Sequence, residues 1–196
     1  ALALRDLIGA TLDLGRLEAG RATIVVEPFE VAALLEEIRS ELELLVHPPL
    51  HVSWRESVGP RTIFTDREKV KTILRNLVGN AIKFTARGSV EVEIGLSRGR
   101  LEIVVRDTGV GIATAQLSNI FEMFRQVDAS NSRRFGGVGL GLYIVKRLTE
   151  RLGGEVTAES EVDVGSTFRV SLPVREGPKR VEEDFPLPAD EPGARR

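Results

Sequence analysis

The sequence predicts an α/β protein in which several amphipathic helices pack on one β-sheet. Helical periodicity and strand-like alternation follow one another along the chain, and glycine-containing turns join neighbouring strands into hairpins. Hydrophobic residues make up 42% of the chain, as in ordinary globular proteins, and 196 residues suffice for one well-packed domain with short appendages. We therefore expect a single main domain.

The composition excludes several classes of function. The formal net charge is −2 and acidic and basic residues are interspersed, which predicts no binding to nucleic acid and no electrostatic contact with membranes. The absence of cysteine rules out disulfides and thiolate chemistry and agrees with a reducing, cytoplasmic setting. No apolar run approaches the roughly 20 residues needed to cross a bilayer, and Arg5 and Asp6 interrupt the apolar N-terminal stretch. We expect this chain to contact no membrane.

Residues 1–20 form the first predicted segment, a helix over 2–19 that ends at Gly20. Its apolar stripe is narrow, as in coiled coils and helical bundles, although an ordinary amphipathic helix on the domain's own core stays an alternative. The stripe consists of Leu4, Leu7, Thr11 and Leu14. The chain starts inside this pattern without an initiating methionine, so we expect a piece of a longer protein.

Residues 21–175 contain the predicted main domain. It begins with a short strand at 24–27 and a helix over 29–46, which a stop at Pro48 and Pro49 follows. Strands are expected at 50–55 and 61–64. A long helix then starts at Asp66, because Thr65 opens a Thr-Asp-Arg-Glu capping box. The expected core residues of the two helices are Val31, Leu34, Leu35, Ile38 and Leu42, and Val70, Ile73, Leu74, Leu77, Val78 and Ile82.

The second half of the domain predicts two hairpins separated by a helix. Strands at 90–96 and 100–106 flank a turn at 97–99, a helix covers 140–152, and strands at 155–160 and 167–174 close around Gly165. From Arg175 onward proline, glycine and charged residues dominate. We therefore expect residues 176–196 to form a flexible tail, because too little apolar surface is present to offset the entropy of ordering it.

A polar stripe on the long helix is the first candidate for chemistry. Asn76, Asn80 and Lys83 are spaced by four and three residues, so they project from one side while the apolar residues face the core. Asparagine is a mediocre residue inside a helix, and a hard cation such as Mg²⁺ would explain it by accepting an amide oxygen. A solvated helix face is the alternative.

Asp107 follows a strand and precedes two glycines, Gly109 and Gly111. A carboxylate in this position can accept a hydrogen bond from an exocyclic amino group such as that of adenine, and glycines allow the backbone to approach the ring. The pattern alone is also typical of a common turn.

A glycine cluster at 136–141 opens the next predicted helix. Unpaired N–H groups and the helix dipole favour phosphate there. The cluster is not a Rossmann-type fingerprint, because no strand leads into it, and it is not a Walker loop, because Gly-Lys-Ser/Thr is absent.

Four segments in this order resemble the successive motifs of the ATPase domains of sensor histidine kinases. They are NLVGNAIKFT at 76–85, DTGVGI at 107–112, FEMF at 121–124 and GVGLGL at 137–142. The resemblance covers residues 22–174 approximately, and four ordered motifs are far more specific than any one alone. It implies the GHKL ATPase superfamily and its Bergerat-type fold, a two-layer α/β sandwich of a mixed β-sheet with helices on one face, here preceded by an N-terminal helical remnant.

The resemblance also implies roles for individual residues, matched position by position. Asn80 would ligate Mg²⁺ and act with Lys83 in catalysis, and Asn76 and Lys83 would contact the phosphates of ATP. Asp107 would bind the adenine amino group, and Thr167 would reach adenine through a water molecule. The remaining residues of the nucleotide site would be Gly109, Gly111, Ile112, Gly137, Val138, Gly139, Leu140, Gly141 and Leu142.

Residues 113–136 would form a lid over the nucleotide. In this interpretation Phe121 and Phe124 anchor the lid, and Arg133 or Arg134 contacts the terminal phosphate. The arginines are also explained as solvated loop charges, and the phenylalanines as ordinary core residues.

The phosphoryl-accepting histidine of such kinases is expected outside this chain. Its motif resembles His-Glu-Leu-Arg-Thr-Pro and is absent here, while His47 and His51 flank a proline-rich turn and precede no Glu or Asp. The resemblance then implies an acceptor-histidine helical hairpin, a response regulator and a homodimeric full-length protein as partners, and it leaves membrane anchoring of that protein open. A regulatory module without phosphoryl transfer, or an anti-sigma-type serine kinase, stays the alternative.

Overall fold

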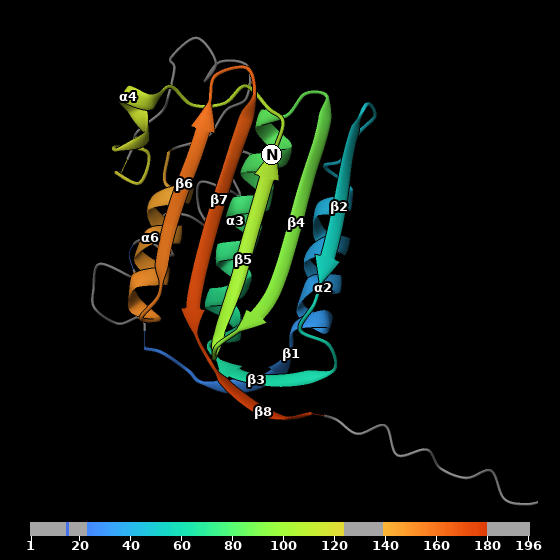
Figure 1. Ribbon diagram of the computed structural model, residues 1–196, viewed down its shortest axis with the longest axis vertical. Coiled ribbons are helices and arrows are strands. Elements are labelled where there is room, and N and C mark those ends of the chain that lie inside the picture. The colour runs from blue at the N-terminus through green and yellow to red at the C-terminus, as the bar shows by residue number, and fades with distance from the viewer. Residues whose placement is uncertain (1–14, 16–22, 124–138, 180–196) are drawn as a thin grey trace, which may run out of the picture.

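A five-stranded mixed β-sheet forms one layer of the structure, a computed structural model that describes residues 15, 23–123 and 139–179. The strand order is β2-β4-β5-β7-β6, with β2 parallel to β4 and the other neighbours antiparallel (Figure 1). The strands are β2 (Leu50–Glu56), β4 (Gly88–Ser97), β5 (Arg100–Asp107), β6 (Glu155–Glu161) and β7 (Gly165–Pro173). Each overlaps a strand that the sequence predicts.

Helices form the second layer and lie behind the sheet in Figure 1. They are α2 (Val31–Glu43), α3 (Arg67–Phe84) and α6 (Gly141–Arg151). Helix α3 is central, because it contacts α2, α6, β4 and β5. A short helix, α4 (Thr114–Leu117), lies against β6. The predicted two-layer α/β sandwich is therefore confirmed.

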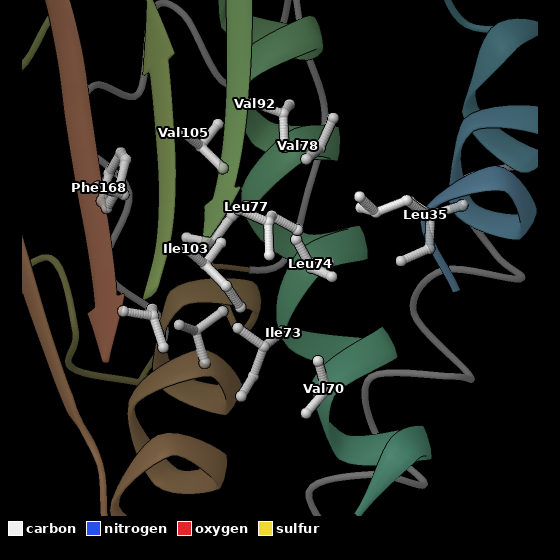
Figure 2. Packing of buried hydrophobic residues seen from close by; sticks show 14 of the residues in the cluster. Leu35, Val70, Ile73, Leu74, Leu77, Val78, Val92, Ile103, Val105 and Phe168 are labelled. Atoms are coloured by element: carbon white, nitrogen blue, oxygen red, sulfur yellow. The ribbon is translucent and has the colours of Figure 1, made fainter. Parts of the chain in front are cut away.

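The core lies between these two layers. All apolar residues that the helical periodicity assigns to the buried faces of α2 and α3 are buried. Figure 2 shows Leu77 pointing from α3 toward the sheet, where Ile103 and Val105 of β5 are fully buried. Burial of one such side chain stabilises the fold by about 1.5–3 kcal/mol. The buried residues of β5 therefore lie on the face of the sheet that packs against α3.

A second, three-stranded sheet corrects two predictions. It consists of β1 (Glu27–Glu30), β3 (Arg61–Thr65) and β8 (Arg175–Lys179), with β3 in the middle and antiparallel pairing throughout. The strand predicted at 24–27 is displaced to β1, where Phe29 is buried. The start of the predicted tail is a strand, because backbone pairing needs no apolar side chains and Arg61 forms an ion pair with Glu176 at 2.8 Å. Residues 180–196 lie outside the described residues.

The N-cap of α3 is Asp66 rather than the predicted Thr65. Asp66 Oδ1 accepts a hydrogen bond from the Lys69 N–H at 3.0 Å, and Oδ2 accepts one from the Val25 N–H at 2.9 Å and contacts the Lys69 ammonium. Thr65 is the last residue of β3 and is paired with Glu27, so it lies one residue before the helix start. Burial alone would raise the pKa of the Asp66 carboxyl, but its hydrogen bonds with Lys69 and Val25 outweigh burial and lower this pKa.

Residues 1–14 and 16–20 of the predicted N-terminal helix lie outside the described residues. Among the helices that the structure describes, none has the length and apolar character required to cross a membrane.

Candidate nucleotide site

Asp107 ends β5 and lies on the face of the sheet that carries the helices. Alternate residues of β5 are buried from Leu101 onward, and Asp107 continues that alternation. Burial raises the pKa of the Asp107 carboxyl, against the opposing effect of hydrogen bonds from Gly109 and Ser166. The Gly109 N–H donates to Oδ1 at 2.9 Å. The structure therefore places a partly buried, oriented carboxyl group at the end of the sheet.

Ser166 is the β7 residue that faces Asp107, and Thr167, for which the sequence predicts a water-mediated contact with adenine, is its neighbour on the strand. The register pairs Asp107 with Ser166 and Arg106 with Thr167. Ser166 is 8% exposed and hydrogen-bonds to Asp107 through its backbone and its hydroxyl. Consecutive side chains of a strand point to opposite faces, so Thr167, the residue after Ser166, lies on the opposite face of the sheet. The apolar alternation farther along β7 is the sequence signal that identifies Ser166.

Thr167 belongs to the open, charged face of the sheet. There Arg106 forms ion pairs with Glu93 at 3.1 Å and with Glu91 at 3.8 Å. Thr167, Arg106 and Glu91 contribute to the lining of a shallow hollow of about 470 Å³. Solvated ion pairs of this kind stabilise a fold by about 0–1 kcal/mol each. The hollow lies at the end of the sheet, because Asp107, Ser160 and Ser166 line it as well.

Gly109 and Gly111 let the loop after β5 approach two other backbone segments. A Cβ atom at Gly109 would lie 2.4 Å from the carbonyl oxygen of Phe84, and one at Gly111 would lie 1.9 Å from the carbonyl oxygen of Glu161. Gly111 also has a φ of +66°, in the left-handed region that favours glycine. The two glycines therefore seat this loop between the end of α3 and the end of β6.

The start of α6 meets the polar stripe of α3. A Cβ atom built on Gly141 would lie 2.9 Å from Asn76 Oδ1 and 3.7 Å from Asn80 Nδ2. Asn76 Nδ2 donates a hydrogen bond to the Thr72 carbonyl at 2.8 Å, which leaves Oδ1 on the side of Gly141. The structure thus brings together two motifs that lie far apart in the sequence. Only a glycine at this position permits the observed approach without displacing an amide.

The N-terminus of α6 suits an anion. Its N-cap is Leu140, whose apolar side chain cannot accept hydrogen bonds from the N–H groups of the first turn. Leu140 is 3% exposed and Leu142 packs against the core, so apolar side chains hold the helix in place. Gly139 precedes it with a φ of +71°. Gly137 and Val138, which the sequence also assigns to this site, lie outside the described residues.

Lys83 completes the polar stripe at the end of α3. It is half-buried, as are Asn76 and Asn80, whereas Leu77 and Val78 on the other side of the helix are buried. The Lys83 ammonium lies 4.9 Å from the centroid of the Phe84 ring, within the range of a cation–π interaction. The predicted division of α3 into a polar and an apolar side is therefore confirmed.

The described part of the predicted lid, residues 113–123, is attached to the core by apolar side chains. Phe121 packs against the core, and its neighbour Ile120, which the sequence motif does not single out, is more deeply buried at 6% exposure. Ile112, just before this segment, is partly buried as well. Phe124, Arg133 and Arg134 lie outside the described residues, so their roles in the lid stay predictions.

The residues around Asn80 fit a Mg²⁺ ion that arrives with a nucleotide better than one held by the protein alone. Across residues 23–123 and 139–179, no group of three or more His, Cys, Asp or Glu side chains could hold a metal ion. Mg²⁺ prefers six oxygen ligands and commonly keeps waters and substrate phosphates among them. One amide oxygen from Asn80, close to a helix start that suits phosphate, is compatible with such a ligand set.

These features define a nucleotide-binding α/β domain. A carboxyl group at a sheet end, a polar helix face and the start of a second helix lie on the same side of one sheet. Residues 65–176 match the family described as histidine kinase-, DNA gyrase B-, and HSP90-like ATPase. The match covers more than half of the chain, and the chain belongs to this family.

Similar proteins are sensor kinases. The chain is 36% identical over 173 residues to the signal transduction histidine-protein kinase BarA of Escherichia coli K12. The aligned region covers 84% of this chain and 19% of BarA. It is also 36% identical over 201 residues to the autoinducer 2 sensor kinase/phosphatase LuxQ of Vibrio cholerae, and this alignment covers 96% of the chain and 23% of LuxQ. The crystal structure of full-length ShkA in complex with AMPPNP superposes with a TM-score of 0.78 at 31% identity, over 89% of this chain and 36% of that chain. The chain thus spans about a fifth of the length of these curated relatives.

Proposed function

We propose that this chain is the ATP-binding catalytic domain of a two-component sensor histidine kinase, and that it donates the γ-phosphoryl group of Mg·ATP to a histidine outside the chain. One observation carries the proposal: Asp107 and the start of α6 flank the asparagine stripe of α3 on the helical side of the sheet. The kinase relatives named above support phosphoryl transfer as the reaction.

In the proposed binding mode, adenine lies at the end of β5. The Asp107 carboxylate accepts a hydrogen bond from the exocyclic amino group, and the glycines of the following loop leave room for the ring. Ser166 and Gly109 hold the carboxylate in place. The base is therefore selected by an acceptor that the protein has already oriented.

The phosphates lie between α3 and α6. The first-turn N–H groups of α6 and the one Asn76 amide N–H that is not bonded to Thr72 donate to phosphate oxygens, and Lys83 adds a positive charge on the same side. Asn80 offers its oxygen to Mg²⁺, which neutralises charge on the phosphates when it is bound. Phosphoryl transfer depends mainly on such positioning and charge stabilisation, so these residues would account for the catalytic contribution of the domain.

The acceptor would come from another part of the full-length protein. His51 is exposed on β2, an edge strand that β4 and β5 separate from β7, and His47 is exposed before β2. Neither side chain is on the elements that carry the proposed phosphate site. We infer an acceptor histidine on a helical hairpin of a homodimeric kinase, a response regulator as the next recipient, and a cytoplasmic location where ATP is available.

Transfer in trans tests the proposal. The 196-residue chain is incubated with γ-labelled ATP, Mg²⁺ and a separately produced acceptor hairpin of a histidine kinase, and acid-labile label on the hairpin is measured. Label is expected with the wild-type chain and is expected to fall strongly with Asp107→Asn. A hairpin whose histidine is replaced by alanine is the control. ATP binding without any transfer to several hairpins would support a regulatory module instead.

A further inference from the structure

Ser160 of β6 makes contacts that the proposed roles leave unexplained. It lies on the helical face of the sheet, opposite Ser166 in the β6–β7 register. Its hydroxyl accepts a hydrogen bond from the Ile112 N–H at 2.8 Å and donates to the Gly165 carbonyl at 2.8 Å, and it lies 3.0 Å from Ser166 Oγ. One side chain therefore joins the loop after β5, the β6–β7 turn and the residue that faces Asp107.

The hydroxyl of Ser160 is surrounded by one donor, one acceptor and a second hydroxyl of the protein. A serine hydroxyl carries one hydrogen and two acceptor lone pairs. One lone pair receives the Ile112 N–H, and the single hydrogen has two acceptors within reach, the Gly165 carbonyl and Ser166 Oγ. When Ser160 donates to Ser166, the Ser166 hydrogen is available for Asp107. All three partners belong to the protein, so Ser160 acts on the surrounding protein groups.

Ser166 transmits this arrangement to Asp107. Asp107 accepts hydrogen bonds from the Gly109 N–H, the Ser166 N–H and the Ser166 hydroxyl. An ionised carboxylate has about four acceptor positions, so these three donors leave about one position for a further donor. An exocyclic amino group supplies one such hydrogen. The match between carboxylate and base therefore depends on where the Ser166 hydroxyl points, which Ser160 constrains.

The loop after β5 depends on Ser160 in the same way. Ile112 follows Gly111, whose close approach to the Glu161 carbonyl seats the loop against the end of β6. The hydrogen bond from the Ile112 N–H to Ser160 is a second attachment of this loop to β6. Removal of the hydroxyl would loosen both the loop that flanks the base and the partner of its carboxylate.

We propose that Ser160 is a positioning residue for adenine recognition, which it serves by fixing the Ser166 hydroxyl and the 109–112 loop around Asp107 without touching the nucleotide. The inference rests on the proposed function, because it requires Asp107 to bind the amino group of adenine. It extends that function by assigning base selectivity in part to a residue outside the four family motifs.

Selectivity between two nucleotides measures this role. Inosine triphosphate carries an oxygen where ATP carries the amino group, so it cannot use the free acceptor position of Asp107. Ser160→Ala in the 196-residue chain is expected to weaken Mg·ATP binding about fivefold in calorimetry, the size of one net hydrogen bond, and to weaken Mg·ITP binding less than about twofold. Ser160→Thr keeps the hydroxyl and is expected to restore the wild-type ratio of affinities. Thr157→Ala, on the exposed face of the same strand, is the matched control.

The outcomes separate this inference from the proposed function. If the wild-type chain binds ATP and ITP equally and Asp107→Asn changes neither, adenine recognition by Asp107 is wrong and both ideas fail. If the wild-type chain prefers ATP through Asp107 but Ser160→Ala lowers both affinities equally or neither, the role of Ser160 alone is refuted. Should Ser160→Ala fail to fold by circular dichroism, Ser160→Cys carries the test, because a thiol fills the space but is a weak donor and acceptor. Its ATP preference is then expected to lie below that of the wild type, and an unchanged preference overturns the proposal.

Discussion

Gly141→Ala tests the phosphate end of the proposed site, because it adds one methyl group where α6 meets α3. The new Cβ would lie 2.9 Å from Asn76 Oδ1, closer than ordinary van der Waals contact, and 3.7 Å from Asn80 Nδ2. The Asn76 amide is held by its hydrogen bond to the Thr72 carbonyl at 2.8 Å. Relief of the clash therefore displaces an amide that the proposal assigns to phosphate.

Two effects on the free energy of unfolding oppose each other in this variant. Alanine in place of a helical glycine stabilises by at most about 1 kcal/mol, and a weakened Asn76–Thr72 hydrogen bond costs about 1 kcal/mol. The net change in stability is therefore expected to be close to zero. ATP binding has no such compensation, because a lost hydrogen bond to a charged group costs about 1.5–3 kcal/mol. We expect the affinity for Mg·ATP to fall at least about tenfold.

Calorimetry with Mg·ATP and urea unfolding measure the two quantities separately. Gly79→Ala is the stability control, since Gly79 is also helical and its added methyl group would meet no heavy atom within 4 Å. It is expected to show the gain in helix propensity alone. An unchanged ATP affinity in folded Gly141→Ala would refute the placement of the phosphates at the start of α6.

Two further substitutions test other parts of the structure. Asn80→Ala is expected to weaken ATP binding mainly when Mg²⁺ is present, and an unchanged ratio of affinities with and without the ion contradicts the metal assignment. Asp66→Ala is expected to lower the free energy of unfolding by about 2 kcal/mol with ATP affinity retained, because it removes the α3 cap and the partner of Lys69. The folded state lowers the pKa of Asp66 from 3.8, so the wild type keeps this contribution above that pH and loses it as the pH falls through the folded-state pKa. Urea unfolding from pH 7 into acid checks this, and parallel pH profiles for the wild type and Asp66→Ala would contradict it.

Local periodicity was sufficient to predict the helices and one side of the site. A helix of period 3.6 divides its own residues into faces, so the buried side of α3 and the polar side with Asn76 and Asn80 follow without knowledge of any partner. The end of β5 was predictable in the same way, because alternation places Asp107 on the buried side of its strand.

Errors arose where one segment depends on pairing with a distant one. Thr167 is a different case: the family motif assigns it to adenine, whereas the alternation of buried residues along β7, in agreement with the register against β5, places Ser166 on the helical face. Strand β8 forms because Arg175 lies over the Phe64 ring, with 4.5 Å to the ring centroid, and Glu176 meets Arg61 far earlier in the chain. The polar composition from Arg175 onward predicts a flexible tail, because the sequence does not reveal these distant partners.

The two ends of the proposed nucleotide site belong to different layers of the sandwich. Asp107 is part of the sheet, whereas Asn76 and Asn80 are part of α3. A nucleotide bound as proposed would therefore bridge the layers, and the apolar side chains between them, among them Leu77 and Ile103 in Figure 2, would set the span from base to phosphate. The hydrophobic core thereby fixes the distance between the residues that bind the base and those that bind the phosphates. A substitution that changes the thickness of the core would alter nucleotide affinity without changing any binding residue.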